Sequence, residues 1–111
     1  MENLLIFLKI ISDKTRLRIL LLLLEREMCV CELQAIMNES QPKISKHLAK
    51  LKSLNLISDR RAEKYIYYST SITNPLYKEL INIIKNNHND YPLLKIDIGK
   101  IDEVTRRIRG V

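Results

Sequence analysis

Two cysteines, Cys29 and Cys31, stand one residue apart and are the only cysteines of the 111-residue chain. Paired thiolates are soft ligands that suit a thiophilic ion. Residues two apart on a regular helix point ~200° apart, so these thiols can converge on one ion only in an extended or distorted segment. Arg26 and the amide groups of a helix start would lower the pKa of nearby thiols. The pair therefore predicts a soft-ion site whose occupation distorts the start of the following helix.

A second distinctive segment is the basic stretch at residues 41–52, which Ser40 precedes as an N-cap and Pro42 suits as a first turn. One face of the resulting helix would be apolar, formed by Ile44, Leu48, Leu51 and Leu54. A helix anchored on one side that offers cations and small polar groups on the other is suited to the DNA major groove. The side chains expected to contact DNA from this helix are Gln41, Lys43, Ser45, Lys46, His47 and Lys50.

Two short runs with β-forming residues follow this helix, at residues 56–61 and 64–69. They predict a basic β-hairpin, although its turn lacks the expected Gly. A DNA-reading helix followed at once by such a hairpin is the order of a winged helix-turn-helix. We expect Arg60, Arg61 and Lys64 of the hairpin to contact phosphate or the minor groove.

The charge of the chain is concentrated in these two elements. Lys and Arg number 19 against 13 Asp and Glu, a net charge of +6, and residues 41–64 contain seven of the cations but two of the acids. Such clustering is typical of phosphate binding and predicts strongly salt-dependent affinity. An anionic membrane surface would also attract these cations, but membrane binding usually pairs them with apolar residues on an exposed face. Here the apolar residues are needed to fill the core. Double-stranded DNA is therefore the expected partner.

The remaining patterns predict further helices, so the expected fold class is mainly α with a small β-hairpin, a homodimeric winged helix-turn-helix. The additional helices are expected at residues 4–11, 15–25, 31–37 and 75–87. A domain of this size cannot cover two strongly apolar terminal helices alone, which indicates that they pack against a second copy. The residues expected in this dimer interface are Leu4, Leu5, Leu8, Leu76, Leu80, Ile83 and Ile84.

We expect residues 1–90 to form the DNA-binding domain with its terminal dimerisation helices, and residues 91–111 to form a C-terminal extension. In that extension residues 95–98 alternate like a strand, and residues 102–109 could form a last helical turn or two.

Composition and motifs also narrow the class of protein. No secretory signal and no apolar run of ~20 residues is present, so a cytoplasmic protein with reduced cysteines is expected. The sequence contains no Gly-rich phosphate loop, no pair of carboxylates at a telling spacing and no Ser/His/Asp set. Nothing in it therefore indicates an enzyme. A small thiol oxidoreductase would need Cys-x-x-Cys spacing. A protein-interaction module with the same fold is a further alternative, and it would show no operator preference.

Several separated motifs resemble the ArsR/SmtB family of metal-responsive winged-helix repressors, in order along the chain. Residues 12–20 resemble the opening of that family's second helix, and residues 40–48 its recognition helix. Tyr67 and Tyr68 resemble its second wing strand, and residues 29–33 its thiolate box in arsenic and antimony sensors. The resemblance implies a homodimer that binds an inverted-repeat operator and represses transcription without ligand. It further implies that As(III) or Sb(III) bound at Cys29 and Cys31 releases the DNA.

The resemblance is incomplete at the ligand site. Arsenic sensors of this type often carry a third cysteine where this chain has Gln34. A small external thiol or hydroxide would then complete the site. The alternative is a repressor of the same family whose cysteines sense redox state or are purely structural, with a different ligand or none.

Overall fold

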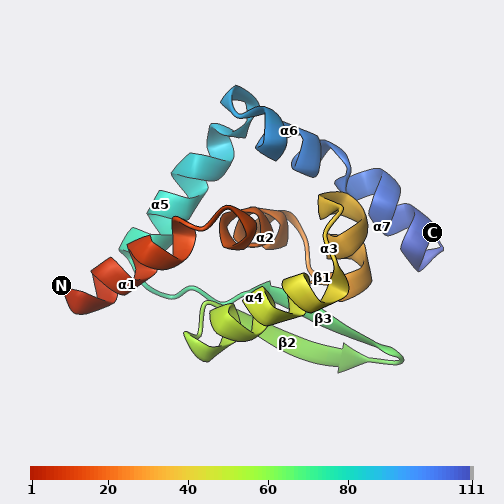
Figure 1. Cartoon of the computed structure of the whole chain (residues 1–111), viewed down its shortest axis with the longest axis horizontal. Helices are drawn as coiled ribbons and strands as arrows, with labels where there is room; N and C mark the ends of the chain where they lie inside the picture. Colours follow the sequence, from red (N-terminus) through yellow and green to blue (C-terminus); the bar gives the residue numbers. More distant parts are fainter. Residues whose placement is uncertain (111) are drawn as a thin grey trace.

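The computed structural model describes residues 1–110, and its helices surround a central one, with a β-hairpin at one side (Figure 1). Along the chain the elements are α1 (Glu2–Ile11), α2 (Lys14–Glu25), β1 (Met28–Cys29), α3 (Val30–Met37), α4 (Gln41–Ser53), β2 (Ile57–Ala62), β3 (Tyr65–Thr70), α5 (Pro75–Asn86), the 3-10 helix η1 (His88–Asp90), α6 (Pro92–Gly99) and α7 (Ile101–Arg109). Helices α3 and α4 form the helix-turn-helix, and β2 and β3 form the wing. The predicted fold class, mainly helical with a small β-hairpin, is confirmed.

Local capping determines where three of the helices begin. The side chain of Asp13 accepts a hydrogen bond from the Arg16 backbone N–H at the start of α2. Ser40 accepts one from the Lys43 N–H at the start of α4, and Asn74 does the same for the first turn of α5. These side chains satisfy amide groups that have no partner within the helix. The predicted N-cap at Ser40 is confirmed.

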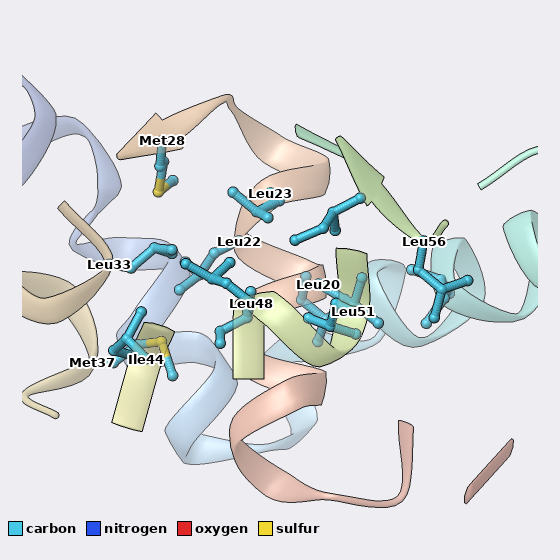
Figure 2. Packing of buried hydrophobic residues seen from close by; sticks show 14 of the residues in the cluster. Leu20, Leu22, Leu23, Met28, Leu33, Met37, Ile44, Leu48, Leu51 and Leu56 are labelled. Atoms are coloured by element: carbon cyan, nitrogen blue, oxygen red, sulfur yellow. The ribbon is translucent and has the colours of Figure 1, made fainter. Parts of the chain in front are cut away.

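The core is built around α2, whose leucines at positions 20–23 are almost entirely buried. Figure 2 shows Leu20 and Leu22 of this helix facing Leu48 and Leu51 of α4, with Leu33 of α3 beside them. Burying each such leucine side chain contributes ~1.5–3 kcal/mol. The apolar stripe of α4 is therefore fixed against α2 and α3, and the opposite face of α4 is directed outward.

The wing belongs to a three-stranded antiparallel sheet in the order β1-β3-β2. In the hairpin Ile57 pairs with Thr70 and Ala62 with Tyr65, so Glu63 and Lys64 form its tip. Glu63 adopts a left-handed backbone with φ of 56°, which supplies the turn that Gly commonly provides. The third strand, β1, was not predicted because two residues are too short for any periodic pattern.

Helices α1 and α5 pack together at one end of the molecule, where the rings of Phe7 and Tyr77 stack with centroids 4.1 Å apart. Phe7 of α1 and Ile81 of α5 are buried. The other sides of both helices carry exposed apolar side chains, namely Leu5, Ile6, Leu8, Leu76 and Ile83. This apolar face is therefore exposed to water in a single chain. Such exposure is a requirement of the predicted dimer surface, which stays a prediction. No helix within residues 1–110 is long and apolar enough to cross a membrane.

The C-terminal extension forms two helices packed against α2 and α3. The strand expected at residues 95–98 is wrong, because this segment lies inside α6, which begins at Pro92. Leu94, Asp97 and Ile101 fall on the buried side at helical spacing. The charge of Asp97 hides that stripe in the sequence, since it is buried only because Arg18 binds it. The expected final helix is confirmed as α7.

Candidate functional site: a basic reading helix and wing beside a thiol pair

The outward face of α4 carries two lysines that make no ion pair among residues 1–110. Lys46 and Lys50 are exposed one turn apart, on the side of α4 opposite the buried Ile44, Leu48 and Leu51. A hollow beside them is lined by Asp13, Arg16, Lys46, His47, Ala49 and Lys50. Unpaired cations on an exposed helix are suited to contacts with DNA phosphates.

The first turns of α4 present polar groups that bond to one another. The side-chain amide of Gln41 donates to the hydroxyl of Ser45 at 2.7 Å. Lys43 forms an i,i+4 ion pair with Glu39. Both contacts are exposed, so they can be exchanged for contacts with base edges. Gln41, Lys43 and Ser45 thus lie together at the N-terminal end of α4, and their role in reading DNA stays a prediction.

His47 is half-buried between α4 and the start of α2. Burial lowers its pKa, although the charge of Asp13 opposes the change, and the imidazole is therefore neutral near pH 7. A neutral ring can still donate a hydrogen bond to a phosphate oxygen.

The wing separates the three cations that the sequence groups together. Arg60 lies on the sheet, where its guanidinium bonds both carboxylate oxygens of Glu27 and lies 5.2 Å from the centre of the Tyr67 ring. Arg61 and Lys64 are exposed near the tip and make no ion pair within the described residues. Within residues 1–110 neither tip cation has an acidic partner, although the Lys64 ammonium lies 5.5 Å from the centre of the Tyr65 ring, whereas Arg60 is paired with Glu27.

The two thiols already lie together. Cys29 is the last residue of β1, with an extended backbone (φ −88°, ψ 171°), and Cys31 is in the first turn of α3. Their Sγ atoms are 3.0 Å apart in a thiol–thiol hydrogen bond. The expectation that the thiols converge in an extended segment is met at Cys29, whereas the loss of regular geometry expected at the start of the following helix is not needed. Convergence follows from the strand-to-helix junction between the two cysteines, and α3 stays regular.

Burial raises the pKa of the Cys29 thiol to about 12, and the hydrogen bond with Cys31 and the carboxylate of Glu32 add to this shift. The expected lowering of the thiol pKa by Arg26 is therefore wrong for Cys29. The guanidinium of Arg26 instead bonds Asp102 and Thr105 of α7. In the absence of a bound ion, the Cys29 side chain is a neutral thiol at neutral pH.

The donor set nevertheless fits a soft ion. Thiolate–zinc bonds measure about 2.3 Å, so two Sγ atoms on one ion of similar size lie at most ~4.6 Å apart. The separation of 3.0 Å between the Sγ atoms of Cys29 and Cys31 lies within this limit. Within residues 1–110, no group of three or more His, Cys, Asp and Glu side chains is placed to hold a metal. Two protein thiolates are thus the ligands that the described residues offer.

Comparisons with known proteins place this arrangement among bacterial regulators. Residues 13–59 match the family model described as "Bacterial regulatory protein, arsR family". The chain is 51% identical to the arsenic resistance transcriptional regulator ArsR2 of Pseudomonas putida over 61 residues, 54% of this chain and 53% of that protein. It is 50% identical to the arsenical resistance operon repressor of Escherichia coli over 64 residues, 57% of this chain and 55% of that protein. The chain thus spans about half the length of these two relatives.

A relative with broader coverage is the transcriptional repressor SdpR of Bacillus subtilis, 39% identical over 84 residues, 74% of this chain and 93% of that protein. Among solved structures, the transcriptional regulator HlyU from Vibrio vulnificus superposes with a TM-score of 0.71 and 29% identity, covering 78% of this chain and 88% of that one. The transcriptional repressor BigR from Xylella fastidiosa superposes with a TM-score of 0.67 and 28% identity, covering 77% of this chain and 82% of that one.

Proposed function

We propose, since this chain belongs to the ArsR family of bacterial regulatory proteins, that it is a transcriptional repressor released from its operator by a thiophilic metalloid. Its relatives and structural neighbours are transcriptional regulators and not enzymes, so the chain is not a thiol oxidoreductase. The observation that carries the metalloid proposal is the convergence of the Cys29 and Cys31 thiols at the junction of the wing sheet and α3.

The DNA-binding surface in this proposal consists of α4 and the wing tip. Lys46, Lys50, Arg61 and Lys64 supply cations for phosphates. Gln41 and Ser45 lie where the N-terminal end of a recognition helix meets base edges. The partner is double-stranded DNA with an inverted repeat, because a two-fold dimer presents two such surfaces.

The proposed homodimer forms through the exposed apolar face of α1 and α5. Leu5 and Ile83 are 56% and 52% exposed in the single chain, and exposed apolar side chains gathered on two adjacent helices are typical of an interaction surface. Residues 1–90 would then be the DNA-binding and dimerisation unit, with residues 91–111 as an extension packed on it.

The proposed switch acts through the position of Cys29. Bound As(III) or Sb(III) would supply two bonds to sulfur in place of the thiol–thiol hydrogen bond, and a small external thiol or hydroxide would complete the site. Cys29 is paired with Tyr67 of the wing strand β3, and Cys31 lies in the helix that precedes α4. Any displacement of the thiols is therefore applied to the wing and to α4. A coupling of ~1–3 kcal/mol between ligand and DNA would suffice for regulation.

A titration of the operator complex with As(III) under reducing conditions tests the proposal. One equivalent per subunit should release the DNA from the unaltered protein. The Cys29→Ser protein should bind the operator normally and stay bound when As(III) is added. Release of that variant at the same As(III) concentration would show that this thiol pair is not the sensor.

A further inference from the structure

Arg109, near the end of α7, contacts the segment that carries the thiols although it is 77 residues further along the chain than Glu32. Its Nε and one Nη donate to the two carboxylate oxygens of Glu32, at 2.7 and 3.1 Å. The same Nη also donates to the backbone carbonyl of Glu27. Figure 1 shows α7 lying beside α3, which agrees with these contacts.

Glu32 joins Arg109 to the thiol pair. Its side chain is fully buried, and its Oε1 accepts a hydrogen bond from the backbone N–H of Cys29 at 3.0 Å. A buried carboxylate keeps one position only when its oxygens have partners, and the planar guanidinium supplies two donors in fixed geometry. Arg109 thus determines where Glu32 lies, and Glu32 determines how the backbone turns at Cys29.

We propose that Arg109 is a positioning residue for the thiol pair, and this inference rests on the proposed function of that pair. The guanidinium fixes both sides of the strand-to-helix junction, at the carbonyl of Glu27 and, through Glu32, at the amide of Cys29. Without Arg109 the junction loses these restraints, and the two Sγ atoms no longer stay within the reach of one ion. Residues that orient a metal ligand in this way typically contribute ~10–100-fold to metal affinity.

The rest of the extension keeps α7 in place for this role. Asp97 of α6 binds Arg18 of α2 through two hydrogen bonds of 2.7 and 2.8 Å, and both side chains are buried. Lys100, between α6 and α7, donates to the carbonyl of Ile36 at the far end of α3. The extension therefore contacts α3 at both ends, and Arg109 is its contact at the thiol end.

The test compares Arg109→Ala with Arg107→Ala, a matched control on the same helix whose arginine pairs with Glu103 and not with α3. Cd(II), followed by thiolate charge-transfer absorbance, and As(III), followed by calorimetry, are the two probes. Arg109→Ala should bind both ions ~10–100-fold more weakly. Arg109→Lys should bind them with intermediate affinity, because an ammonium retains the charge but not the paired donors. Arg107→Ala should behave as the unaltered protein.

Hydrogen exchange of the Cys29 amide gives a readout that needs no ion. It should be faster in Arg109→Ala and unchanged in Arg107→Ala. Unaltered exchange together with unaltered Cd(II) affinity in Arg109→Ala would overturn the proposal, and Arg109→Lys decides by the same criterion if the alanine variant does not fold. Failure of the proposed function would give a different result. The operator complex of the unaltered protein would then survive As(III), while hydrogen exchange at Cys29 would still be faster in Arg109→Ala than in the unaltered protein.

Discussion

Cys29 is the antiparallel strand partner of Tyr67, so the thiol pair is part of the sheet that forms the wing. On its other side Cys29 directly precedes α3, the first helix of the helix-turn-helix. One residue is thus attached both to the wing strand and to the helix that precedes α4. In the proposed switch, a soft ion at this junction would need no melting of a helix to affect DNA binding, because Cys29 is paired directly with the wing strand.

Replacing the exposed lysines of α4 tests the DNA surface. Lys46→Ala and Lys50→Ala should each weaken binding to every sequence and reduce the slope of log affinity against log salt by about one for each phosphate that the lysine neutralises. Lys78→Ala on α5 is a control, since Lys78 is exposed on a helix assigned to the dimer. Gln41→Ala should instead alter operator preference. An unchanged salt slope in both lysine variants, measured by fluorescence anisotropy, would place the DNA elsewhere.

Charging the exposed apolar face of the terminal helices tests the dimer. Leu5→Glu and Ile83→Glu should give folded monomers, because these side chains are exposed in the single chain but would meet a partner copy in the dimer. A monomer has one half-site to bind and loses operator affinity. Sedimentation equilibrium measures the mass, with Lys78→Glu as a control. Intact dimers in both variants would remove α1 and α5 from the interface.

Adding a third thiol tests the ligand set. Gln34 is half-buried one turn after Cys31 on α3. Gln34→Cys should increase affinity for As(III), since a third soft ligand replaces an external one. The same change in a Cys31→Ser background should not restore the affinity of the unaltered site if Cys29 and Cys31 form the primary pair. Competition with a small dithiol measures each affinity, and equal affinities with and without the added thiol would contradict this ligand set.

The pH dependence of ion binding should differ between Cd(II) and As(III). Burial raises the pKa of Cys29 to about 12, so its thiol remains protonated at neutral pH. Cd(II) must displace that proton, and its affinity should rise about tenfold per pH unit for each proton released. Arsenous acid exchanges hydroxide for sulfur, and the thiol proton leaves within the water formed, so As(III) affinity should be nearly flat. Titrations between about pH 6 and 8 measure both slopes. A flat Cd(II) profile would show that Cys29 is not a ligand.

The buried ion pair between α2 and α6 should contribute strongly to stability. Asp97→Ala leaves the Arg18 guanidinium uncompensated in the interior and should lower the free energy of unfolding by ~3–5 kcal/mol. Asp102→Ala is the control, because its pair with Arg26 is largely exposed and should change stability little. Urea unfolding measures both. Similar midpoints for the two variants would show that α6 is held by its apolar contacts alone.

The sequence alone determined those elements whose signal is local and periodic. The stripe of Ile44, Leu48 and Leu51 predicted both the existence and the orientation of α4, because side chains three or four apart share a helix face. Ser40 predicted where that helix begins, since a hydroxyl at the N-cap bonds an amide three residues away. The hairpin and the position of the basic surface followed from the same kind of short-range pattern.

Tertiary structure decided what depends on partners far apart in the chain. The two thiols meet because β1 pairs with β3, which extends the backbone at Cys29, and a two-residue strand leaves no pattern to recognise. Asp97 is buried because Arg18 lies opposite it, 79 residues earlier, and no local pattern around Asp97 contains that partner. Arg60 and Arg109 found carboxylates at Glu27 and Glu32 for the same reason. Ion pairs form between residues that are close in space. The sequence gives the charge of each residue but not which residue lies beside it in the folded chain.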